Sequence, residues 1–122
     1  MNTIVERLDK IKSNITLLKT VKPVNIIAVS KTFSIDHIRP LVDYGHTHFG
    51  ENKVQEAISK WNILKSKKKD LNLHFIGKLQ TNKVKDVVKL FDYVHSLDNQ
   101  KLADSLNKYQ NNLNKNLKYF IQ

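Results

Sequence analysis

The segment NIIAVSKTF, residues 25–33, joins a short apolar run to a lysine. Two isoleucines and a valine within residues 25–30 predict a buried β-strand. Because side chains alternate between the two faces of a strand, Ile27, Val29 and Lys31 share a face, with Lys31 just past the carboxyl end. Ligands bind at that end in α/β folds, so Lys31 is a candidate nucleophilic amine. A strand-end lysine that simply extends into solvent would have the same pattern.

Apolar periodicity predicts further elements on both sides of this strand. Apolar stripes with helical spacing cover residues 4–18, 38–42, 54–61, 84–91 and 102–113. Predicted strands cover residues 25–30, 46–50, 71–76, 93–96 and 117–121. Because helices and strands alternate, we expect an α/β fold with a parallel sheet and helical crossovers.

Capping and turn residues separate these elements. Ser34 and Asp98 are predicted helix N-caps, and Gly45 is predicted to end a helix. Pro23 follows the first helical stripe. The lysine run at residues 65–69 falls between a helix and a strand, so we expect a solvated loop there.

Composition narrows the function classes. The sequence has no cysteine, which excludes disulfide and thiolate chemistry and is compatible with the cytoplasm. No apolar run approaches the roughly 20 residues of a membrane helix. The formal charge of +10 comes from scattered lysines, so we expect no nucleic-acid partner, although a basic nucleic-acid-binding module is an alternative. The histidines show no metal-ligand spacing, and we expect no metal.

Polar residues also follow the second and third predicted strands. The block FGEN, residues 49–52, offers a glycine that permits close backbone approach and the amide of Asn52. Asn52 could equally be the N-cap of the next helix. The block HFIGKLQTNK, residues 74–83, gathers polar groups after the third strand in the same way.

Four blocks in this order carry a family resemblance. They are AVSKT at 28–32, FGEN with VQEA within 49–57, HFIGKLQTNK at 74–83 and VHSLD at 94–98. Together they resemble the pyridoxal-phosphate homeostasis proteins, which are single-domain (β/α)₈ barrels like the N-terminal domain of alanine racemase. The resemblance implies that residues 1–122 form the N-terminal half of such a barrel, truncated near strand five.

The resemblance also implies a cofactor and a site. Pyridoxal 5′-phosphate would form a Schiff base with Lys31, and Asn52 would lie near it. His74, Phe75 and Gly77 would line the same mouth of the barrel. The implied role is cofactor homeostasis without established turnover and without catalytic residues, in the cytoplasm. The implied partners are the cofactor and the apoenzymes that use it.

Two alternatives to a homeostasis protein stay open. One is a racemase-like enzyme that uses the same cofactor, which would need acid–base groups on both faces of the reacting carbon. The other is a non-functional fragment, because the family's phosphate-binding loops lie in the second half of the barrel. Family members are mostly monomeric, whereas half a barrel exposes two sheet edges. We therefore expect this chain alone to self-associate or to fold poorly.

Overall fold

A computed structural model describes residues 3–17 and 24–121 of the chain. The described helices are α1 (Thr3–Leu17), α2 (Ile35–Asp43), α3 (Val54–Lys67), α4 (Val84–Leu90) and α5 (Gln100–Asn112), with a 3₁₀ turn η1 (Thr81–Lys83) before α4. The described strands are β1 (Ala28–Val29), β2 (His48–Glu51), β3 (Asn72–Phe75), β4 (Tyr93–Leu97) and β5 (Lys118–Ile121).

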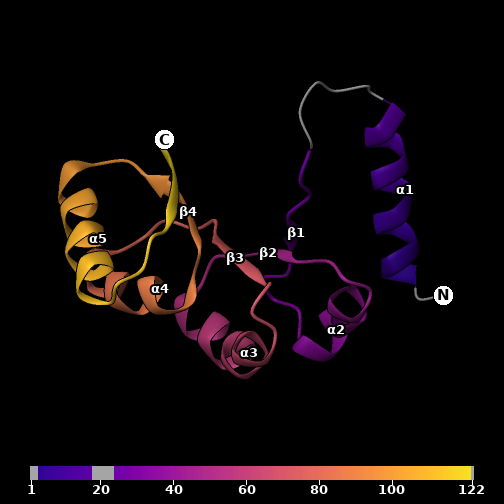
Figure 1. The fold of residues 1–122 in the computed structure, drawn as a ribbon, viewed down its shortest axis with the longest axis horizontal. Helices are drawn as coiled ribbons and strands as arrows, with labels where there is room; N and C mark the ends of the chain where they lie inside the picture. Colours follow the sequence, from indigo (N-terminus) through magenta and orange to yellow (C-terminus); the bar gives the residue numbers. More distant parts are fainter. Residues whose placement is uncertain (1–2, 18–23, 122) are drawn as a thin grey trace.

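The strands form one sheet in the order β1-β2-β3-β4-β5, and every neighbouring pair is parallel. Right-handed crossovers between strands in sequential order place their helices on the same side of a sheet. Figure 1 shows this arrangement, with α2 to α5 following one side of the strands. The prediction of an α/β fold with barrel-type strand order is therefore confirmed.

The two faces of the sheet have different surroundings. On the helix-facing side, the Phe49 ring lies 4.8 Å from that of Trp61, and the Phe75 ring lies 5.3 Å from that of Phe91. Burial of such side chains stabilises the fold by roughly 1.5–3 kcal/mol each. The opposite, concave face carries Gly50, whose backbone is approached by the Ile27 and Ile76 side chains.

Two of the three predicted helix-end residues are confirmed. The Ser34 side chain accepts a hydrogen bond from the His37 N–H, and Gly45 ends α2 with φ +100°. The prediction for Asp98 is wrong, because Asn99 is the N-cap of α5. The Asn99 side-chain oxygen accepts from the Leu102 N–H at 2.8 Å, three residues on, a reach that suits an N-cap.

The lysine run is only partly a loop, which corrects the prediction for residues 65–69. Helix α3 continues to Lys67, and the Lys65 ammonium donates to Asp92 Oδ2 at 2.6 Å and to the Leu90 carbonyl. Basic side chains in a last turn also interact favourably with the helix dipole. Lys68 and Lys69 are exposed beyond the helix end, as expected.

The first helix and first strand are less regular than predicted. In α1, Val5 and Leu8 are buried, whereas Ile11 is 49% exposed because α1 packs against α2 and not along the whole sheet. Strand β1 spans only Ala28–Val29. The predicted end of the first apolar stripe at residue 18, and Pro23 after it, lie outside the described residues. Among the residues that are described, no helix has the length and apolarity to cross a membrane.

Candidate functional site

The carboxyl ends of three strands bring the predicted site residues to one edge of the sheet. Val29 is opposite Gly50, and Gly50 is opposite His74. Lys31 lies two residues after Val29, and Asn52 lies two residues after Gly50. This register explains why residues far apart in the sequence meet at the same edge.

Asn52 and Gly77 are in direct contact. A β-carbon built on Gly77 would lie 2.6 Å from the Asn52 carbonyl oxygen, closer than real β-carbons come. The Asn52 side-chain oxygen Oδ1 is buried, and no group in the described part of the chain donates to it. Asn52 is also not the N-cap of α3, because Lys53 holds that position. A buried acceptor of this kind calls for a donor from a ligand or a water molecule.

Lys31 is exposed between two residues that the fold holds in place. Ser30 before it is fully buried, and its N–H donates to the Gly50 carbonyl at 3.0 Å. Thr32 after it has φ +68°, a left-handed conformation that β-branched residues rarely adopt. Its N–H donates to Glu56 Oε1 at 2.8 Å.

A buried acid–base cluster lies directly behind Lys31, and sequence reasoning missed it. Glu51 is fully buried and its Oε2 accepts from Ser30 Oγ at 2.5 Å, Lys60 Nζ at 2.9 Å and Trp61 Nε1 at 3.0 Å. One signal was available in the sequence. Glu51 is two residues after Phe49 in β2, so both side chains point to the helix-facing side of the sheet. A carboxylate buried on that side requires a cationic partner.

His74 lies in a row of three imidazoles across the concave face. Its Nε2 is 2.9 Å from His48 Nδ1, and its Nδ1 is 2.9 Å from His95 Nε2. Burial, followed by the charges of His95 and His48, lowers the pKa of His74 to about 4. Its ring also stacks on Tyr93 at 4.0 Å. His74 is therefore neutral at pH 7, with both ring nitrogens engaged.

The Phe75 ring lies on the helix-facing side of the sheet, away from His74, although Phe75 and Asn52 both line a hollow of about 310 Å³. Its side chain is 2% exposed and packs against Phe91 on the helix-facing side. The family resemblance implies one mouth for His74, Phe75 and Gly77, but strand alternation sends the Phe75 ring away from the face that carries His74. Its part in cofactor binding stays a prediction.

A hollow of about 320 Å³ lies at the carboxyl ends of β3 and β4. Its lining includes Gly77, Lys78, Ser96 and Asp98. The Ser96 hydroxyl is buried, and among the described residues it has no hydrogen-bond partner. The hollow therefore adjoins the contact between Asn52 and Gly77 and offers further polar groups.

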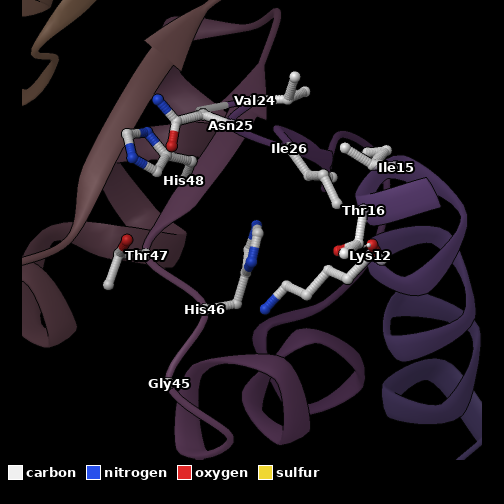
Figure 2. Close-up of a pocket in the computed structure, with 10 residues that line it drawn as sticks. All are labelled: Lys12, Ile15, Thr16, Val24, Asn25, Ile26, Gly45, His46, Thr47 and His48. Atoms are coloured by element: carbon white, nitrogen blue, oxygen red, sulfur yellow. Dashed lines mark hydrogen bonds between the residues drawn. The ribbon is translucent and has the colours of Figure 1, made fainter. Parts of the chain in front are cut away.

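A larger hollow, of about 600 Å³, lies at the opposite end of β2. Figure 2 shows His46 within it and the Lys12 ammonium extending toward that ring. Burial lowers the pKa of His46, and Lys12 lowers it further. Because His46 precedes β2 whereas Asn52 follows it, this hollow is separate from the edge that carries Lys31. In residues 3–17 and 24–121, no group of three or more histidine or acidic side chains is arranged to hold a metal ion.

Comparison with known proteins gives relatives of about twice the length. A pyridoxal phosphate homeostasis protein of Pasteurella multocida is 39% identical over 125 residues, which cover 98% of this chain and 54% of that protein. One from Buchnera aphidicola of Schizaphis graminum is 46% identical over 89 residues, or 73% of this chain and 38% of that protein. The chain thus spans about half the length of these curated relatives.

Solved structures show the same partial coverage. PipY of Synechococcus elongatus with pyridoxal phosphate (PLP) bound is 37% identical, with a TM-score of 0.74 over 88% of this chain and 51% of that one. A Bifidobacterium adolescentis protein has a TM-score of 0.78 over 95% of this chain and 51% of that one, but 24% identity, so it supports the fold alone.

A family model, "Alanine racemase, N-terminal domain", matches residues 7–122. This match agrees with the parallel strand order and with the blocks at the strand ends. The chain therefore belongs to the alanine racemase N-terminal domain family, within which it is similar to the pyridoxal phosphate homeostasis proteins.

Proposed function

We propose that this chain carries the covalent PLP-binding edge of a pyridoxal phosphate homeostasis protein, with Lys31 as the attachment residue. The observation that carries the proposal is the contact between Gly77 and Asn52 beside the strand end that bears Lys31. It brings the ends of the first three strands together with an exposed amine and a buried amide oxygen that lacks a partner among the described residues.

The proposed chemistry needs one nucleophile. The cofactor, when bound, supplies an aldehyde carbon. The Lys31 Nζ, as the neutral amine, forms a C=N bond to that carbon, and the aldehyde oxygen leaves as water. Ser30 and Thr32 hold the backbone on both sides of Lys31, so the side chain starts from a fixed position.

The surrounding groups fit a planar ring that carries polar substituents. The Asn52 amide offers an unpartnered acceptor and an N–H donor. Gly77 keeps the floor of the site free of a side chain. His74 stays neutral at pH 7, so the concave face does not repel a protonated pyridine nitrogen. We assign Phe75 a supporting role beneath this face.

We further propose that the protein binds and releases the cofactor without turning over a substrate. The names of the relatives support this, since those proteins are called homeostasis proteins. PLP-dependent apoenzymes are the proposed recipients. A racemase-like enzyme is a weaker candidate, because none of the contacts at Lys31 in the described part of the chain supplies it with an opposing acid–base pair.

The test is borohydride trapping followed by peptide mass spectrometry. The protein is incubated with PLP and reduced, and the label on each lysine-containing peptide is measured. We expect Lys31 to carry most of the label and Lys31→Ala to lose it. Lys85→Ala, which removes an exposed lysine of α4, is the matched control and should leave the Lys31 label unchanged. Label spread evenly over exposed lysines in the unmodified chain would overturn the proposal.

A further inference from the structure

The backbone around Lys31 is anchored to helix α3 from both sides. Before it, Ser30 Oγ donates to Glu51 Oε2 at 2.5 Å, and the Ser30 carbonyl accepts from Lys60 Nζ at 2.5 Å. After it, the Thr32 N–H donates to Glu56 Oε1 at 2.8 Å. Lys60 and Glu56 are one turn apart on α3. The same helix surface therefore holds the residues on each side of Lys31.

Lys60 is the centre of these contacts. Its ammonium donates to the Ser30 carbonyl and to Glu51 Oε2, and it lies 3.8 Å from Glu56 Oε1. Its side chain is 6% exposed. An ammonium has three N–H donors, and these three oxygens occupy its surroundings. Lys60 is therefore not available as a nucleophile.

The anchored segment also contains strain. Thr32 has φ +68°, and positive φ is unfavourable for a β-branched residue. Such a conformation persists only when surrounding contacts require it. Here the contacts are the Thr32 N–H to Glu56 and the Phe33 N–H to the Ser30 carbonyl at 3.2 Å. Lys60 bonds that same Ser30 carbonyl, so it lies at the junction of both constraints.

We infer that Lys60 is a positioning residue that sets the direction from which the Lys31 amine approaches an aldehyde. The inference rests on the proposed function of Lys31 and adds to it. The Lys60 ammonium neutralises buried Glu51 and fixes the Ser30 carbonyl, while Glu56 fixes Thr32. Lys31 then projects from a strained, fixed turn and reacts in preference to exposed lysines on flexible stems.

The experiment compares Lys60→Met with Lys65→Met. Lys65 is a matched control, because it lies on the same helix and also bonds a carboxylate and a backbone carbonyl, those of Asp92 and Leu90. Its partners belong to the other end of the sheet. In the trapping assay we expect Lys60→Met to lower the Lys31 share of label by about fivefold or more, and Lys65→Met to leave it unchanged.

Two further variants keep the test informative if Lys60→Met fails to fold. Glu56→Ala removes the acceptor of the Thr32 N–H at a partly exposed position and should also lower the Lys31 share. Lys60→Cys provides a rescue, since the chain has no other cysteine. Aminoethylation of the single thiol of this variant in denaturant, followed by refolding, restores an ammonium at the position. The aminoethylated variant should recover Lys31 labelling, whereas the untreated Lys60→Cys variant should not.

Amide hydrogen exchange without cofactor separates this inference from the proposed function. We expect Glu56→Ala and Lys60→Met to speed exchange at Thr32 and Phe33 by at least about tenfold relative to Lys65→Met at matched global stability. Unchanged exchange there, or equal loss of Lys31 label in both lysine variants, would overturn the positioning role. A different outcome is also informative. If exchange is faster in these variants but the unmodified chain never labels Lys31 selectively, the proposed function is overturned instead.

Discussion

Gly77 lies so close to Asn52 that a β-carbon at position 77 would be 2.6 Å from the Asn52 carbonyl oxygen. The neighbouring atom is backbone, so it cannot move aside as the end of a flexible side chain would. The contact joins the chain segment after β2 to the segment after β3. It therefore ties the geometry of the candidate site to the absence of a side chain at one position.

The first prediction is that Gly77→Ala destabilises the fold and disturbs the site together. Overpacking of this kind costs about 1–3 kcal/mol, and the Asn52 backbone must shift to relieve it. Chemical denaturation should show the loss, and cofactor trapping at Lys31 should fall. Gly45→Ala is the control, because Gly45 has φ +100° and open space around it, far from the site. It should lower stability while leaving Lys31 labelling intact; equal loss of label in both variants would contradict the prediction.

The second prediction separates binding from stability at Asn52. Its Oδ1 is buried without a donor among the described residues, so Asn52→Ala removes no hydrogen bond made by that atom. We expect the free energy of unfolding to change by less than about 1 kcal/mol, whereas PLP retention falls about tenfold. Equilibrium denaturation and absorbance titration measure the two quantities. Asn62→Ala, at an exposed site on α3, should change neither. A large stability loss with unchanged PLP retention would show that Asn52 is structural.

The third prediction concerns pH and the histidine row. The pKa of His74 is about 4 in the fold against 6.5 normally, so the unfolded chain binds a proton first as the pH falls. The contribution of neutral His74 to the free energy of unfolding is fully present above about pH 6.5. It is lost as the pH falls to about 4. We expect a loss of about 2 kcal/mol, less than the full shift implies because solvent screens the open face.

His74→Gln isolates this term from the other groups that titrate in the same range. Glutamine keeps a donor and an acceptor for His48 and His95 but does not titrate. Denaturation at several pH values should give a flatter profile between pH 6.5 and 4 for the variant. Asp92, which raises the pKa of His74, is unchanged in both proteins. Identical slopes would mean that His74 does not cause the pH dependence.

The sequence predicts the sheet well because its signals are local and repeated. Each predicted strand overlaps an observed one, and the strand-end positions of Lys31, Asn52 and Gly77 follow from alternation and parallel order. The sequence predicts the helix N-caps less well than the strands, because Asp98 and Asn99 are adjacent residues of similar capping ability. Backbone geometry decides between them, and it favours Asn99, which has extended φ of −154°.

Long-range pairs explain what the sequence did not reveal. Lys60 and Lys65 look like ordinary surface lysines, yet each reaches a carboxylate brought near only by the fold, Glu51 and Asp92 respectively. The lysine run therefore suggested a loop where α3 continues. The family resemblance implies that Phe75 belongs to the site, although alternation directs its ring to the helices, where it contacts Phe91.

The last prediction concerns the exposed edge of the sheet. Ile121 of β5 is 86% exposed and Phe120 is 52% exposed, while Val29 of β1 is 50% exposed at the other edge. Exposed parallel edges with apolar side chains favour pairing with another chain. We expect this chain to self-associate in a concentration-dependent manner, measured by light scattering after size exclusion. Ile121→Lys should lower the mean mass, because a charge at an edge strand opposes pairing.

Ile63→Lys is the control, since Ile63 is 70% exposed on helix α3 and should leave association unchanged. A monomeric parent chain with a sharp thermal transition would contradict the prediction, and equal effects of both lysine substitutions would exclude the β5 edge as the contact.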